Sequence, residues 1–91
     1  PHIKIEEAIH TVLSTEEQLV VVTSVPDEKK GERLVVLMRE DLDPGSIIEG
    51  LSGMGFPNLW IPKRESFKRV DGFPLLGTGK LDLRGIKELA L

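Results

Sequence analysis

A lysine that follows two glycines is the feature of this sequence best suited to chemistry. It lies in the stretch PLLGTGKLDL, residues 74–83. In a phosphate-binding P-loop, G-x-x-x-x-G-K-[ST], backbone amides surround a phosphate while the lysine and hydroxyl reach phosphate and magnesium. Aligning that motif on Gly79 and Lys80 puts Pro74 at its first glycine and Leu81 at its hydroxyl position. The stretch is therefore not a P-loop.

The same glycines do not form a dinucleotide-binding motif. In G-x-G-x-x-G, the spacing from Gly77 and Gly79 puts Asp82 at the last glycine. Because glycine permits positive φ and close approach, the loop can carry Lys80 outward ahead of a helix. A cation there faces the positive end of the helix dipole, which costs about 0.3–1 kcal/mol. Two interpretations stay open: a solvated lysine at a helix start, or a lysine retained for an external anion.

Three stretches with helical spacing of apolar residues must position this loop. The first lies near the start of the chain, the second follows Asp43-Pro44, and the third closes the chain after Asp82. Asp43 and Asp82 are predicted N-caps, and Gly55 is predicted to end the second helix. The apolar positions are Ile5, Ala8, Ile9, Val12 and Leu13, then Ile47, Ile48, Leu51 and Met54, then Leu83, Ile86, Leu89 and Ala90.

Two β-branched apolar runs predict strands covered on both faces, at residues 18–25 and 33–39. The charged stretch PDEKKGE between them predicts an exposed antiparallel connection. Residues 65–70 are a weaker strand candidate, and FPNLWIPK before them is expected to be an extended loop pinned by Trp60. The order predicts an α+β fold, a central three-stranded sheet flanked by about three helices.

Size and composition describe one small soluble-type domain. With 91 residues, 40% of them apolar and 30% charged, the chain can bury one modest core, so an active site enclosed by this chain alone is not expected. A net charge of -3 argues against bulk attraction to nucleic acid, and none is predicted as a partner. The absence of cysteine excludes disulfides and cysteine-based metal sites. His2 and His10 lack a third ligand at suitable spacing, so no metal site is predicted.

The densest basic group lies in the weaker strand candidate and just before it. Its members are Lys63, Arg64, Lys68 and Arg69. They could dock an acidic carrier protein by steering opposite charges. The alternative is a solvated strand edge that discourages aggregation.

The stretch SFKRVDGFPLLGTGKLDLRGIKEL, residues 66–89, resembles the last motif of the adenylate-forming enzymes. This superfamily contains acyl-CoA synthetases, nonribosomal-peptide adenylation domains and luciferases. Its pattern is filled in order by Phe67, Val70-Asp71, Phe73-Pro74, Thr78, Gly79-Lys80 and Leu89. With the preceding FPNLWIPKR, the form is most similar to the bacterial bifunctional acyl-acyl carrier protein synthetase/2-acylglycerophosphoethanolamine acyltransferases.

The resemblance implies that residues 1–91 are the C-terminal domain of a larger AMP-binding ligase, with a catalytic loop at 74–82. In that family a fatty acid carboxylate attacks ATP to give an acyl-adenylate and pyrophosphate, and a thiol of acyl carrier protein or CoA then takes the acyl group. Lys80 corresponds to the family's lysine that bridges carboxylate and α-phosphate, and Gly77, Thr78 and Gly79 to its substrate loop. ATP and Mg²⁺ would be bound mainly by an N-terminal adenylation domain of the same chain, so the fragment alone is expected to be inactive.

The subfamily further implies a role in lysophospholipid reacylation, in the cytoplasm or at the inner membrane through the rest of the parent chain. One departure limits the transfer of roles. Many members carry an arginine three positions after the lysine, where this sequence has Leu83, with Arg84 next. The family's hinge and glycine loop would lie before Pro1. The rival interpretation is a stand-alone α+β regulatory or protein-interaction domain, in which Lys80 is an incidental surface residue.

Overall fold

The computed structural model describes residues 2–91 and confirms the predicted α+β fold. Three α-helices and three strands follow one another in the predicted order, with two short 3₁₀ helices before the last strand. The elements are α1 (His2–Val12), β1 (Val20–Asp27), β2 (Gly31–Met38), α2 (Pro44–Gly53), η1 (Asn58–Trp60), η2 (Arg64–Ser66), β3 (Phe67–Arg69) and α3 (Leu83–Ala90).

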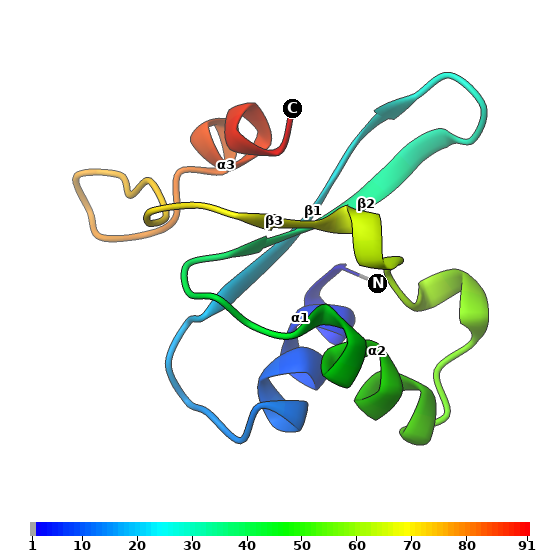
Figure 1. Cartoon of the computed structure of the whole chain (residues 1–91). Helices are drawn as coiled ribbons and strands as arrows, with labels where there is room; N and C mark the ends of the chain where they lie inside the picture. Colours follow the sequence, from blue (N-terminus) through cyan, green and yellow to red (C-terminus); the bar gives the residue numbers. More distant parts are fainter. Residues whose placement is uncertain (1) are drawn as a thin grey trace.

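The sheet has the order β1-β2-β3 and is mixed (Figure 1). β1 and β2 are antiparallel along their whole length, from Val20 opposite Met38 to Asp27 opposite Gly31. The tight connection is shorter than the predicted one, because both strands extend into it. β3 runs parallel to β2 and pairs only with its last three residues, Val36 to Met38.

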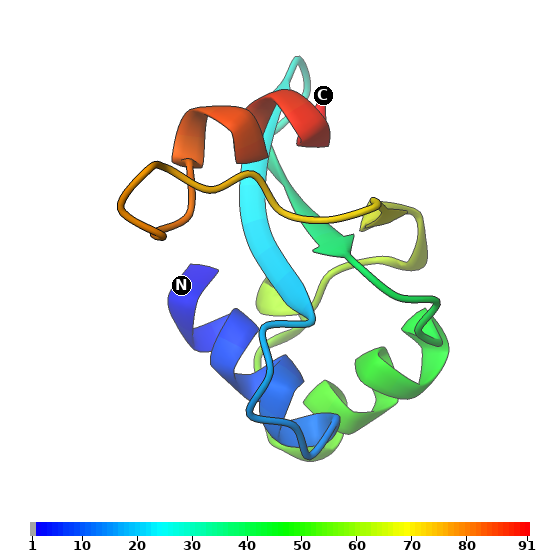
Figure 2. The same ribbon diagram turned by 90° about the vertical axis from the view of Figure 1, so that its left-hand side faces the viewer.

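Helices cover both faces of the sheet, as the continuous apolar runs of β1 and β2 predict (Figures 1 and 2). Alternate strand residues point to opposite faces, so each strand contributes to two cores. One core joins α1 and α2 to the sheet through Ile5, Ala8, Ile9, Val20, Val22, Val36, Met38, Ile47 and Leu51. The other joins α3 to the sheet through Val21, Val25, Val35, Leu37, Val70, Ile86 and Ala90.

Both predicted N-caps are confirmed. The Asp43 carboxylate accepts hydrogen bonds from Gly45 N at 3.0 Å and Ser46 Oγ at 2.8 Å. The Ser46 hydroxyl, together with the Gly45 amide, lowers the pKa of Asp43 below its ordinary value. Asp82 caps α3 by accepting from Gly85 N at 3.2 Å.

Two of the predicted apolar positions are exposed to solvent. Leu83 is 70% exposed and Met54 is 47% exposed. Leu83 is the first residue of α3 and Met54 caps the end of α2, so each lies at a helix terminus. Helical spacing identifies a face, but not how much of that face finds a partner.

His10 and Glu6 have roles that the sequence did not reveal. His10 Nε2 accepts hydrogen bonds from the backbone amides of Leu19, at 3.1 Å, and Val20, at 3.3 Å. One turn earlier on α1, Glu6 Oε1 accepts from Val22 N at 2.9 Å. These side chains therefore satisfy outward-facing amides of β1, which is an edge strand.

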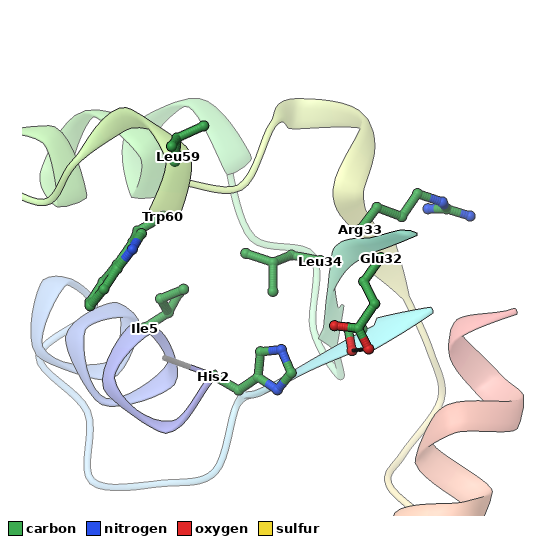
Figure 3. A pocket seen from close by; sticks show the side chains of 8 residues that line it. His2, Ile5, Glu32, Arg33, Leu34, Leu59 and Trp60 are labelled. Atoms are coloured by element: carbon green, nitrogen blue, oxygen red, sulfur yellow. Dashed lines mark hydrogen bonds between the residues drawn. The ribbon is translucent and has the colours of Figure 1, made fainter. Parts of the chain in front are cut away.

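Trp60 lies in the short helix η1 rather than in a wholly extended loop, which corrects that prediction. Its ring centroid is 6.1 Å from that of Phe56, and the residue is 36% exposed. Beside it is a hollow of about 200 Å³ between α1, β2 and η1, in which Trp60 stands next to Ile5 while His2 turns toward Glu32 (Figure 3). Trp60 thus packs against its own chain while keeping an exposed edge.

Candidate functional site

Lys80 lies beside the three-residue loop of a hydrogen-bonded hairpin. Leu75 and Leu81 form an antiparallel bridge, and the amide of Leu76 donates to the carbonyl of Lys80 at 2.7 Å. A tight turn closes the loop, with Gly79 N donating to Leu76 O at 2.9 Å. Gly79 has φ of +90°, the left-handed conformation that completes a three-residue hairpin loop.

This geometry corrects the expectation of a glycine-flexible loop. Gly79 uses positive φ, whereas Gly77 does not. The backbone of Lys80 is fixed by its carbonyl bond to Leu76, so the glycines shape a defined turn rather than giving the lysine free reach. The sequence alone does not identify this turn, because Gly-Thr-Gly is compatible with many loops. The turn type becomes clear only once the pairing of the flanking residues is known.

The hairpin is held to α3 through Pro74 and Asp82. The backbone amide of Asp82 donates to the carbonyl of Pro74 at 2.9 Å, just below the Leu75–Leu81 bridge. The Asp82 carboxylate also caps α3. α3 is in turn anchored on the sheet by Ile86, 1% exposed, and Ala90, 3% exposed. A continuous set of contacts therefore runs from the sheet core to the lysine.

The lysine side chain is available to an external group. Lys80 is exposed, and within residues 2–91 its ammonium has no hydrogen bond or ion pair. The hairpin projects beyond the N-terminal end of α3 and away from the sheet (Figures 1 and 2). Large apolar side chains surround the lysine in sequence and are also exposed: Leu75 by 61%, Leu76 by 49% and Leu83 by 70%.

The two other residues of the predicted substrate loop lie in the same turn. Gly77 and Thr78 are exposed at its tip, and among the described residues the Thr78 hydroxyl has no hydrogen-bond partner. The structure thus brings all four predicted loop residues together on one projecting hairpin. Arg84, the residue next to the family's arginine position, is exposed in the first turn of α3.

The basic group does not form one uniform patch. Lys68 donates to the carbonyl of Leu89 at 2.6 Å, in the last turn of α3. Arg69, on the opposite side of β3, lies with its Nε 3.4 Å from Asp41 Oδ1. Arg64 lies beside the start of α2, where an added Cβ on Gly45 would be 2.7 Å from its Nη2. Two of the four cations are therefore engaged with their own chain.

Acidic and imidazole side chains do not gather anywhere in residues 2–91 in a way that could hold a metal ion. Asp82, the carboxylate nearest the lysine in sequence, is occupied as an N-cap. The described residues therefore do not fit a Mg²⁺ site. No helix among residues 2–91 combines the length and the apolar character needed to cross a membrane.

The fold matches domains of solved acyl-activating enzymes, although no family model and no curated protein matches the sequence. A fatty acyl CoA synthetase of Mycobacterium tuberculosis is 27% identical, with a TM-score of 0.74, over 93% of this chain and 16% of its own. ATP-bound MatB from Rhodopseudomonas palustris is 22% identical, with a TM-score of 0.72, over 96% and 17%. An AMP-forming acyl-CoA synthetase-like protein of Dyadobacter fermentans is 18% identical, with a TM-score of 0.72, over 98% and 26%.

The chain thus spans about a sixth to a quarter of the length of these proteins. Nearly all of its own residues are matched, so the likeness covers the sheet, the helices and the lysine hairpin together. The three-stranded mixed sheet with helices on both faces is the fold of the C-terminal domain of adenylate-forming enzymes.

Proposed function

We propose that this chain acts as the C-terminal domain of an AMP-forming acyl-activating ligase, in which Lys80 assists adenylate formation. The observation that carries the proposal is an exposed lysine, without a partner among residues 2–91, beside the loop of a defined hairpin in a domain of this fold. Residues 1–91 are assigned as one domain, and its partner as an N-terminal adenylation domain of the same chain.

Adenylate formation requires a cation positioned beside the reacting groups. A carboxylate that attacks the α-phosphate of ATP brings two anions together, and charge builds on the phosphate oxygens in the transition state. An ammonium about 3.5 Å from an anion is worth about 5 kcal/mol at an effective dielectric of 20, against about 1 kcal/mol in water. Lys80 is therefore effective only where water is excluded.

The residues beside Lys80 suit that requirement. Leu75, Leu76 and Leu83 expose apolar surface around the hairpin instead of burying it in this domain. When the hairpin enters a cleft of the larger domain, these leucines displace water from around the ammonium. Domain rotation after adenylation would withdraw the hairpin for the thiol step.

ATP and Mg²⁺ are assigned to the larger domain. Support for ATP comes from the matched MatB structure, which is described as ATP-bound. Because the residues described here do not fit a Mg²⁺ site, no step is assigned to that ion. The proposed acyl substrate is a fatty acid, with acyl carrier protein or CoA as acceptor. A link to lysophospholipid reacylation, in the cytoplasm or at the inner membrane, belongs to the same proposal.

The test separates the two half-reactions in the full-length enzyme. We expect Lys80→Ala to lower acyl-adenylate formation by on the order of 10²–10³-fold, as loss of one preorganised donor does elsewhere. Transfer from preformed adenylate to the thiol should change little. Lys29→Ala is the matched control, because Lys29 is an exposed lysine on the β1–β2 turn. Equal loss in both half-reactions, or no loss, contradicts the assigned role of Lys80.

An acidic carrier as acceptor has a separate test. Lys63 and Arg64 are exposed, while Lys68 and Arg69 contact α3 and Asp41. Under the docking hypothesis, Lys63→Glu with Arg64→Glu raises the apparent KM for the carrier without changing adenylate formation. An unchanged KM leaves these cations as a solvated strand edge.

A further inference from the structure

We infer that Gly85 is a positioning residue for Lys80, because its missing side chain lets Pro74 lock the hairpin onto α3. This inference rests on the proposed function for the role of Lys80, but its structural part can be tested without activity. Gly85 lies in the first turn of α3, three residues after the N-cap Asp82. Its backbone conformation does not require a glycine, because the φ of Gly85 is not in the left-handed region.

The contact between Gly85 and Pro74 is too close for any side chain. A Cβ at position 85 would lie 2.7 Å from Pro74 Cγ and 3.0 Å from Pro74 Cβ. It would also lie 3.1 Å from an oxygen of Asp82, the residue whose amide donates to the carbonyl of Pro74. An alanine here must therefore displace the proline ring or the start of α3.

Displacement at Pro74 passes directly to the lysine. Pro74 and Asp82 are the last hydrogen-bonded pair below the hairpin, and the Leu75–Leu81 bridge and the Leu76–Lys80 bond follow. α3 itself cannot easily yield, because Ile86 and Ala90 are buried in the sheet core and Lys68 donates to Leu89 O. The hairpin, which is exposed, is the part that moves.

The chain supplies two matched glycine controls in α2. At Gly50 an added Cβ would lie 2.6 Å from Val12 Cγ1, so Gly50→Ala creates a clash of similar size between α1 and α2. At Gly53 nothing lies within 4 Å, so Gly53→Ala reports only the gain in helix propensity. Neither position touches the hairpin.

The structural experiment measures amide chemical shifts and hydrogen exchange in the 91-residue chain. We expect Gly85→Ala to shift the amide signals of Leu76, Gly79 and Asp82 and to speed their exchange. Adding Pro74→Ala, which removes Cγ, should restore them in part, while Gly50→Ala and Gly53→Ala should leave them unchanged. Unchanged hairpin signals in Gly85→Ala overturn the inference, as does a double variant that remains as perturbed or as unfolded as Gly85→Ala.

The functional experiment uses the full-length enzyme. Since a misplacement of about 1 Å can cost on the order of 10²-fold, we expect Gly85→Ala to lower kcat for adenylate formation by roughly 10- to 100-fold. KM and the rate of acyl transfer from preformed adenylate should not change. Adding Pro74→Ala to the same chain should recover part of the lost kcat. A hairpin that moves without any loss of adenylation contradicts the role of Lys80 itself, whereas a hairpin that does not move contradicts only the role of Gly85.

Discussion

On the α1–α2 face of the sheet, apolar side chains fill the core and polar side chains accept hydrogen bonds at the exposed edge of β1. On the α3 face, by contrast, a hairpin leaves its apolar and charged groups in solvent. Ile9 and Leu51 are fully buried on the first face, and His10 accepts from the amides of Leu19 and Val20 at the start of β1. On the second face Ile86 is buried, but Leu76 and Lys80 are exposed. The first face supports the domain, and the second holds a projecting group in place.

The largest expected effect comes from a truncation on each face. Ile9→Ala and Ile86→Ala should each lower the free energy of unfolding by about 2–5 kcal/mol, because both side chains are fully buried. Urea denaturation measures this. Only Ile86→Ala should also speed hydrogen exchange at the amides of Leu76 and Asp82, since α3 holds the hairpin. Faster exchange there in Ile9→Ala would mean that the two faces are not independent.

A smaller effect separates the two histidines of α1. His10→Ala should cost about 1–3 kcal/mol, because it leaves the partly buried amides of Leu19 and Val20, at the start of β1, without their acceptor. His2→Ala is the control, since His2 makes no hydrogen bond among residues 2–91. Chemical denaturation of both variants under the same conditions gives the comparison. Equal stability of the two variants would show that water replaces His10 at the strand edge.

The hairpin leucines should contribute little to stability. We expect Leu76→Ser to change the free energy of unfolding by no more than about 0.5 kcal/mol, as for an exposed site without special contacts. Thermal unfolding of the isolated chain measures this. A cost near that of Ile86→Ala would show that Leu76 is buried in solution, and the contrast between the two faces would then be wrong.

The smallest effect is a pH dependence at the start of α2. The Ser46 hydroxyl and the Gly45 amide hold the pKa of Asp43 below its ordinary value of 3.8. A lowered folded-state pKa gives stability that is present above the unfolded-state value and is lost as pH falls through the folded-state value. Asp43→Asn keeps an acceptor for Gly45 but cannot titrate. Its free energy of unfolding, measured by urea denaturation at a series of pH values, should therefore depend less on pH below 3.8 than that of the unsubstituted chain. An identical acid slope in both proteins would contradict this assignment.

The sequence was sufficient where the signal is local. Asp43-Pro44 and Asp82 marked two helix starts because capping depends on residues within one turn. The doubly covered strands followed from continuous apolar runs. The hairpin around Lys80, the acceptor role of His10 and the fit of Gly85 against Pro74 did not follow, because each depends on contacts that no local sequence pattern marks. Periodicity also could not show that Leu83 is mostly exposed.

The antiparallel pairing of β1 with β2 has a consequence for the order of folding. Its partners are at most 18 positions apart, from Asp27 with Gly31 to Val20 with Met38, whereas Lys87 of α3 reaches Ser24 across 63 positions. Closing the longer loop costs more entropy and comes later, so we expect the β1–β2 hairpin in the folding nucleus and α3 among the last elements to dock. During synthesis the lysine hairpin, which depends on α3, would then reach its final shape only after the rest of the domain has formed.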